Sequence, residues 1–167
     1  MASLIYFAPL LKRLEGGYAG NIDGKTCTMK GITLEVYQKH FGRDKTCSDL
    51  KRISDSEWYT ITKLDYWDVV RADEIANQSV ANIIVDFVFN SGKSVIKRIQ
   101  RIVNVTPDGI VGKKTLSAIN NADQEELFYK LWNRRKKFYE DICKKNPNQK
   151  VFLRGWLNRL NYFKYVG

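Results

Sequence analysis

Two carboxylates and a threonine hydroxyl occur within a short stretch of sequence near the N-terminus of the chain. Glu15 directly precedes two glycines, and Asp23 and Thr28 follow within the polar segment NIDGKTCT, residues 21–28. A carboxyl group held partly out of water can donate a proton, and a second carboxyl or hydroxyl group can orient or activate water. These are the groups that hydrolysis of a glycosidic bond requires. From spacing alone, the structural interpretation is favoured, because a glutamate before two glycines is most often a solvated surface charge and Asp23 and Thr28 can be turn-forming side chains.

The residues before Glu15 have the pattern of an amphipathic helix. The predicted helix covers about residues 3–14, and Gly16-Gly17 would end it. Its apolar residues recur on one face: Leu4, Phe7, Leu11 and Leu14. The negative end of a helix dipole disfavours the ionised form of a carboxyl group placed there, which suits a proton donor. Strand signals occur only in residues 18–32, where a hairpin would fold Asp23 and Thr28 back toward Glu15.

The rest of the chain is almost wholly helical in pattern. Capping residues mark three helix starts: Thr33, Ser54 with Glu57, and Asp123 with Glu126. The predicted helices cover residues 34–41, 55–70, 79–91, 95–103, 113–120, 127–145 and 151–166. Segment 79–91 is apolar on nearly all sides, which predicts a central buried helix, whereas the basic run RRKK at 134–137 is expected to be a solvated helix face. We therefore expect an all-α, α-dominated fold with room for a small β-hairpin near residues 18–32.

The charge balance narrows the range of partners. The 167 residues include 28 Lys and Arg against 18 Asp and Glu, a net charge of +10. Such a charge favours a polyanionic partner, and nucleic acid, anionic lipid and the bacterial cell wall all qualify. The apolar stretch SLIYFAPLL at 3–11 lacks preceding basic residues and a small-residue cleavage site. We therefore expect no signal peptide and treat this stretch as a helix of the fold.

Three cysteines and a single histidine offer little metal-binding capacity. Cys27, Cys47 and Cys143 are widely spaced, with no CxxC or CxxH pairing. A zinc site is therefore not expected, and neither is any other metal. The odd number favours three reduced thiols, although a bridge between Cys27 and Cys47 stays open as an alternative.

Several motifs in order along the chain resemble one family of enzymes. The pattern begins with EGGY at 15–18 and continues with Asp23, Thr28 and the GIT of residues 31–33. Four later segments follow: Tyr66-Trp67, Asp86 with Asn90-Ser91-Gly92, IQRIVNVTPDGIVGKKTL at 99–116, and FLRGWLNR at 152–159. Together they cover nearly the whole chain. They resemble the N-acetylmuramidases of glycoside hydrolase family 108, found in phage endolysins and secretion activator proteins.

The resemblance implies a lysozyme-like fold and a set of site residues. Residues 1–92 would form the catalytic lobe, and residues 93–167 a helical peptidoglycan-binding lobe packed with it as one compact unit. Glu15 would be the general acid, and Asp23 and Thr28 would place or activate water. The implied substrate-binding residues are Tyr18, Tyr66, Trp67 and Asn90.

The resemblance also implies partners and a place of action. The substrate would be bacterial peptidoglycan, and the enzyme would act as a monomer without a metal or an organic cofactor. Neither nucleic acid binding nor stable membrane insertion is expected. Since no signal peptide is expected, the protein would reach the cell wall from the cytoplasm through a holin or a secretion system.

The loop around Asp23 departs from the family pattern. Family members often read D-P-x-D-P-G-G there, whereas this chain reads GNIDGKTCT with one aspartate. The role of Asp23 therefore stays open between holding water, steadying positive charge and capping the loop. Two other functions also stay open: a non-catalytic peptidoglycan-binding module with a degenerate site, and a basic nucleic-acid-binding protein. Core packing for Tyr18, Tyr66 and Trp67, and helix capping for Asn90, are the structural alternatives to binding.

Overall fold

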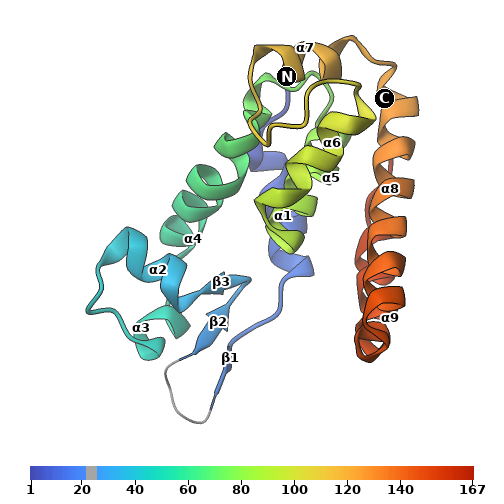
Figure 1. Ribbon diagram of the computed structural model, residues 1–167. Helices are drawn as coiled ribbons and strands as arrows, with labels where there is room; N and C mark the ends of the chain where they lie inside the picture. The colour runs from blue at the N-terminus through green and yellow to red at the C-terminus, as the bar shows by residue number, and fades with distance from the viewer. Residues whose placement is uncertain (22–25) are drawn as a thin grey trace. The chain divides into compact units, whose positions relative to one another are not determined.

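The computed structural model describes residues 1–21 and 26–167, and the chain forms two compact units. Leu4–Asp68 make up the first, here called the sheet unit, and Met1–Ser3 together with Val69–Gly167 make up the second, the helical unit. Figure 1 labels their helices and strands. Within the described residues, no helix combines the length and the apolar character needed to cross a membrane.

The sheet unit holds four α-helices and a small antiparallel sheet. The helices are α1 (Leu4–Leu14), α2 (Leu34–Phe41), α3 (Cys47–Lys51) and α4 (Asp55–Thr62). The strands are β1 (Ala19–Gly20), β2 (Cys27–Met29) and β3 (Ile32–Thr33), in the order β1-β2-β3. Strand pairing places Ala19 beside Thr28 and Thr28 beside Thr33. The predicted hairpin is therefore confirmed, with a third strand added.

The turn between β2 and β3 is held from both sides. Lys30 and Gly31 both have positive φ angles, 48° and 79°, as the two central residues of a tight hairpin turn require. The indole nitrogen of Trp58 donates a hydrogen bond to the Lys30 carbonyl at 3.0 Å. Because Trp58 itself is fully buried, this bond ties the turn to the core of the unit.

Local capping signals fix the starts of two helices as predicted. Thr33 caps α2 by accepting a hydrogen bond from Val36 N, and Ser54 and Glu57 form a reciprocal capping box at α4. The predicted continuation of α4 to residue 70 as an α-helix is wrong. The helix changes at Thr62 into a π-helical turn, η1 (Lys63–Trp67), and then into a short 3-10 turn, η2 (Asp68–Val70).

A disulfide joins the sheet to α3. Cys27 of β2 is bonded to Cys47, the first residue of α3, and Cys143 is free and buried. The expectation of three reduced thiols is therefore wrong. The cysteines are 20 positions apart in the chain, and folding brings their Cα atoms to 6.0 Å, within the range that a disulfide spans. Only the packing of β2 on α3 creates this proximity, so sequence spacing could not decide it.

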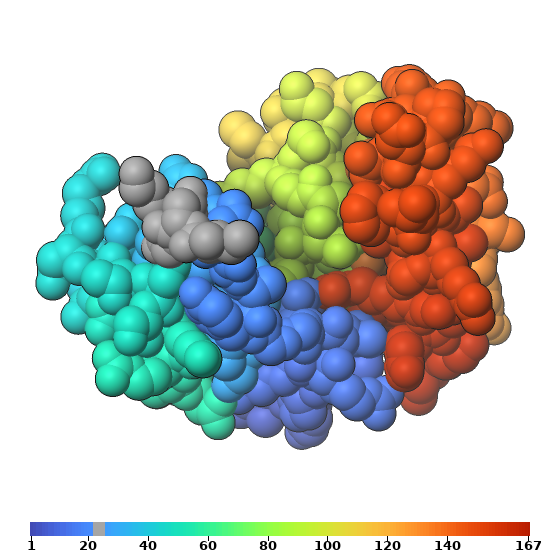
Figure 2. All heavy atoms as spheres, turned by 90° about the horizontal axis from the view of Figure 1, so that it is seen from below, coloured from blue at the N-terminus to red at the C-terminus, as the bar shows by residue number. Residues whose placement is uncertain are grey.

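The helical unit is built around the predicted central helix. Its α-helices are α5 (Gln78–Ser91), α6 (Ile96–Ile102), α7 (Lys113–Asn121), α8 (Gln124–Lys145) and α9 (Lys150–Leu160). The 3-10 turn η3 (Ala72–Glu74) precedes α5, η4 (Lys93–Val95) lies between α5 and α6, and η5 (Pro147–Gln149) lies between α8 and α9. Helix α5 is buried along most of its length and packs against α8. Helices α8 and α9 also pack together, and their orange and red atoms lie together in Figure 2.

The C-terminal segment leaves the helix earlier than predicted. Helix α9 ends at Leu160, although the sequence pattern predicted helix as far as residue 166. The last residues instead return to the start of α5, where the Val166 carbonyl accepts hydrogen bonds from Asn77 Nδ2 and Ser79 Oγ, and Val166 N donates to Ser79 Oγ. These long-range contacts pair the backbone N–H and C=O of Val166 outside any helix.

We predict that unfolded, non-reduced protein exposes one titratable thiol and that reduction raises this number to three. Closing a loop of this length by a disulfide stabilises a protein by about 3 kcal/mol, because it restricts the unfolded chain. Denaturant unfolding with and without a reductant should therefore differ by about that amount. Cys143→Ser is the control, since it removes the free thiol and should leave the difference intact. Three titratable thiols without reductant would contradict the prediction.

Candidate active site

Glu15 lies at the C-terminal end of α1. Its backbone N–H donates to the Leu11 carbonyl at 3.0 Å, so the residue continues the helical hydrogen bonding one step beyond Leu14. Its side chain is half-buried. Gly16 and Gly17, which follow, are exposed, and a Cβ atom built on either would meet nothing within 4 Å. The carboxyl group therefore stands at a helix terminus beside backbone that a large ligand can approach.

The π-helical turn η1 brings Tyr66 into the electrostatic neighbourhood of Glu15. The phenol of Tyr66 is half-buried. Burial raises its pKa above the ordinary value, and the negative charges of Asp65 and Glu15 raise it further. The hydroxyl group thus stays protonated and available as a hydrogen-bond donor across the physiological pH range. Single π-turns within α-helices often occur at functional sites, because they change the direction of side chains.

Trp67 and Tyr18 occupy different environments. Trp67 is fully buried and packs on Phe7, with ring centroids 6.3 Å apart, so its visible contribution is to the core. Tyr18 is 39% exposed, and the Lys51 ammonium lies 5.3 Å from its ring centroid. The Tyr18 ring also covers Gly20, where an added Cβ would lie 2.5 Å from the phenol oxygen. Substrate binding by Tyr18 and Trp67 stays a prediction.

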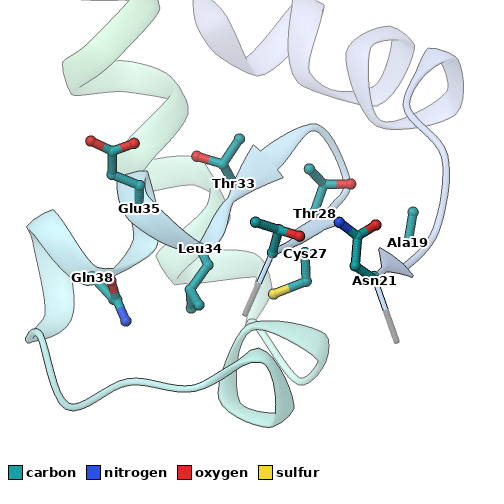
Figure 3. A pocket seen from close by; sticks show the side chains of 10 residues that line it. Ala19, Asn21, Cys27, Thr28, Thr33, Leu34, Glu35 and Gln38 are labelled. Atoms are coloured by element: carbon teal, nitrogen blue, oxygen red, sulfur yellow. The ribbon is translucent and has the colours of Figure 1, made fainter. Parts of the chain in front are cut away.

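Thr28 lines a pocket of about 650 Å³ in the sheet unit. Strands and α2 supply its walls: Ala19, Gly20, Asn21, Thr26, Cys27, Thr28, Thr33, Leu34, Glu35 and Gln38. Figure 3 shows Thr28 and Thr33 on their strands and Glu35 and Gln38 on the neighbouring helix. Glu15 does not belong to the lining that the described residues form, and Asp23 lies outside the described residues. The predicted catalytic residue Thr28 therefore lines a pocket, and Glu15 lies at a helix end of the same unit.

Sequence reasoning singled out Thr28 as a catalytic residue and Thr33 as a helix cap, but none of the other polar residues of this pocket: Asn21, Thr26, Glu35 and Gln38. The signal was present, because Thr26 and Thr28 alternate with the buried Cys27 as expected for one polar face of a strand. The segment was too short for the alternation to be recognised on its own. Among the described residues, no group of three or more His, Cys, Asp or Glu side chains is placed to hold a metal ion.

Asn90 belongs to the helical unit, where a buried chain of contacts holds its side chain. Its Oδ1 accepts a hydrogen bond from the Tyr139 hydroxyl at 2.7 Å. Arg135 Nε in turn donates to the Tyr139 oxygen at 2.8 Å, and Arg135 Nη2 lies 2.5 Å from Asp86 Oδ2. Asn90 itself is exposed, and with its oxygen engaged, the orientation of its amide N–H groups is set from within the unit. Substrate binding by Asn90 stays a prediction.

Asp86 is the charged centre of the helical unit. It is fully buried, and Arg159 adds two further contacts, from Nη2 to Oδ1 at 2.6 Å and from Nε to Oδ2 at 3.1 Å. Burial by itself would raise the pKa of Asp86, but the Arg135 and Arg159 guanidinium groups outweigh it and hold the pKa below its ordinary value. Arg135 is also fully buried, so the expectation that RRKK forms a solvated face is wrong for this residue.

The segment DGxxGxxT at 108–115 is tied together by one buried glutamine. Gln100 Nε2 donates to Asp108 Oδ1 at 2.8 Å, to the Ile110 carbonyl at 3.0 Å and to Thr115 Oγ1 at 3.2 Å. Its Oε1 accepts from Gly109 N at 2.8 Å. The motif's Asp and Thr side chains therefore hold the turn that precedes α7.

Two known protein families match this chain, one over its N-terminal half and one over most of the remainder. A family model described as Glycosyl hydrolase 108 matches residues 9–92, the segment that contains Glu15, Thr28, Tyr66 and Asn90. The chain belongs to glycosyl hydrolase family 108. A second model, described as Predicted Peptidoglycan domain, matches residues 94–161 of this family 108 protein. The resemblance inferred from the motifs is confirmed, and at the level of the family the protein is a peptidoglycan hydrolase.

A solved structure supports the same relationship. The family 108 protein is similar to SagA of Brucella abortus, with a TM-score of 0.80 and 26% sequence identity. The match covers 96% of this chain and 92% of that one. The predicted α-dominated, lysozyme-like fold is confirmed. No protein of curated function matches the chain.

The two ways of dividing the chain differ in where they place α5. The hydrolase model extends through residue 92 and includes this helix, whereas the compact units separate between Asp68 and Val69. Helix α5 is assigned to the helical unit because its apolar face packs on α8. The predicted division into lobes 1–92 and 93–167 stays a prediction.

We predict that Asp86→Ala destabilises the protein by about 3–5 kcal/mol, because it leaves Arg135 as a buried charge without its carboxylate. Urea unfolding at neutral pH measures this change. Glu126→Ala is the control, since Glu126 forms an exposed pair with Lys130 and its loss should cost less than about 1 kcal/mol. Similar losses for the two variants would contradict the buried role.

The same carboxylate should contribute to acid unfolding. Its pKa in the folded state lies below the unfolded value of about 3.9. The stability that ionised Asp86 supplies is therefore complete above that pH and is lost as the pH falls through the folded-state pKa. In urea unfolding between pH 7 and pH 2, Asp86→Asn should lose less stability on acidification than the wild type. Parallel pH profiles for the two proteins would refute this prediction.

Proposed function

We propose that this protein hydrolyses the β-1,4 bond between N-acetylmuramic acid and N-acetylglucosamine in peptidoglycan, with Glu15 as the general acid. The observation that carries the proposal is the position of Glu15, half-buried at the end of α1 inside the segment that matches the hydrolase family.

In the proposed reaction, Glu15 protonates the glycosidic oxygen as the bond to the sugar breaks. Positive charge then develops on the sugar ring, and water attacks the anomeric carbon. Thr28 would orient that water through its hydroxyl group, and Asp23, which lies outside the described residues, would supply the second carboxylate. Tyr66 supports the role of Glu15, since a protonated phenol in its electrostatic neighbourhood can steady the carboxylate left after proton transfer.

Substrate contacts are proposed for Tyr18, Tyr66 and Asn90. Exposed aromatic faces pack against the apolar faces of pyranose rings, which suits Tyr18. The amide N–H groups of Asn90 are donors for sugar hydroxyl or acetamido oxygens, because Tyr139 already occupies its oxygen. Trp67 would act on the site through packing with Phe7, since its own side chain is fully buried.

We also propose that the protein acts outside the cytoplasm, on the cell wall, after release by a holin or a secretion system. The Cys27–Cys47 disulfide supports this proposal, because disulfides persist in oxidising compartments and are rare in the cytoplasm of ordinary bacteria.

Glu15→Gln should lower the rate of wall hydrolysis by about 10²–10⁴-fold, since it removes the proton that general-acid catalysis supplies. The measurement is the release of new reducing ends from purified sacculi, with mass spectrometry to identify the terminal sugar. Matching thermal unfolding curves for the two proteins would show that the fold is intact. Wild-type turnover by the Gln variant would refute the assignment.

The same assay tests the second candidate, a non-catalytic peptidoglycan-binding module. The departure of the GNIDGKTCT loop from the family pattern favours that alternative. It predicts that the wild type sediments with sacculi but releases no new ends. N-acetylmuramic acid at the new reducing ends would support cleavage of the proposed bond. N-acetylglucosamine at these ends would instead indicate glucosaminidase activity.

A further inference from the structure

The pocket that contains Thr28 lies on the polar face of the sheet. Ala19, Thr28 and Thr33 are neighbours across the three strands, and Cys27 and Ile32, which alternate with Thr28 and Thr33, are buried. The pocket volume, about 650 Å³, lies within the range of sites for small ligands. Its walls combine hydroxyl and amide groups with the apolar side chain of Leu34.

Glu35 supplies the one carboxylate among the described residues of this lining, and no lysine or arginine accompanies it there. The residue also borders a second pocket of about 690 Å³, lined by Glu35, Val36, Gln38, Lys39, Gly42 and Arg43. The described lining therefore carries an acidic group and no basic one, in a chain of net charge +10. A cationic group would be attracted to this carboxylate, whereas the net charge of the chain repels cations.

The carboxylate of Glu35 is exposed and has no hydrogen-bonding or ion-pair partner among the described residues. Its natural partner on the helix is Lys39, four positions later. The Lys39 ammonium instead lies 3.7 Å from Asp65 Oδ1. Nearby, Gln38 Nε2 is engaged by the Lys45 carbonyl at 2.7 Å, so the amide does not compensate the charge of Glu35.

We propose that this pocket binds a primary ammonium group of the cell wall, with the Glu35 carboxylate as its partner and Thr28, Thr33 and Asn21 as polar contacts for the adjoining atoms. The proposal rests on the proposed function and defines the substrate more narrowly. Peptidoglycan offers such a group on the diamino acid of the stem peptide, and on glucosamine that has lost its acetyl group. The hydrolase would then distinguish walls by the state of their amines.

A purely structural role for Glu35 is the alternative to exclude. An acidic residue in the first turn of a helix interacts favourably with the helix dipole, whether or not it binds a ligand. Glu125 offers a matched control, because it is exposed and occupies the second position of α8, as Glu35 does in α2. Glu125 does not line the pocket, so it shares with Glu35 only its charge and its position relative to a helix dipole.

Binding should be measured in the full-length Glu15→Gln protein, so that turnover does not interfere. The three probes are a disaccharide–peptide with a free diamino acid amine, the same compound after N-acetylation, and a de-N-acetylated glucosamine oligomer without peptide. Calorimetry at low salt gives the affinities. For an exposed pair, acetylation of the amine should weaken binding about two- to fivefold. At about 1 M salt, where screening acts over about 3 Å, the preference should shrink.

Glu35→Gln should abolish the preference for the free amine, and Glu125→Gln should leave it unchanged. The amine-bearing probe whose affinity falls in Glu35→Gln identifies the source of the ammonium group. Equal binding of free and acetylated probes, or an undiminished preference in Glu35→Gln, would overturn the proposal. Neither result depends on hydrolysis, so a failure of the general-acid assignment would be seen separately, in the sacculus assay.

Discussion

Strands of two and three residues cannot hold a sheet together on their own, so the sheet that carries Thr28 depends on what is attached to it. Three constraints act on it: the Cys27–Cys47 bond to α3, the Trp58 indole on the Lys30 carbonyl, and the Thr33 cap that joins β3 directly to α2. Because α2 follows β3 without a loop, Glu35 is placed by the same constraints that place Thr28. The pocket is therefore a consequence of how the sheet is anchored.

The helical unit depends on the neutralisation of one buried carboxylate, Asp86. Its central helix is apolar on most sides but carries one aspartate, and an unpaired buried carboxylate would be costly. Arg135 and Arg159 neutralise Asp86 from α8 and α9, and aromatic rings surround the buried guanidinium, with Phe87 and Phe163 centroids at 5.4 and 5.5 Å. Replacing such a group by apolar residues is often neutral for stability, so its clearest effect is to fix how three helices align. Asn90, one turn after Asp86, is oriented through the same contacts.

Features encoded by neighbouring residues could be predicted from the sequence. The caps at Thr33 and Ser54, the buried α5 and the position of Glu15 at a helix end all depend on local spacing. The features that were missed depend on residues distant in the chain. The Cys27–Cys47 bond needs β2 to pack on α3, and the burial of Arg135 needs Asp86, whereas the RRKK pattern alone indicated solvent. The π-turn that positions Tyr66 likewise carries no distinctive local signal in KLDYW.

The net charge of the protein and the charges at its candidate site have opposite signs and act over different distances. A net charge of +10 produces a field that concentrates the protein on an anionic wall, and this effect declines over a Debye length of about 8 Å at physiological salt. At contact, the proposed chemistry and the proposed binding both depend on carboxylates, with Glu15 at the end of α1 and Glu35 in the pocket wall. Two lysines of the sheet unit pair with other acids, Lys39 with Asp65 and Lys12 with Asp55. A chain of net positive charge can thus be drawn to an anionic polymer while Glu35 stays without an ion-pair partner among the described residues.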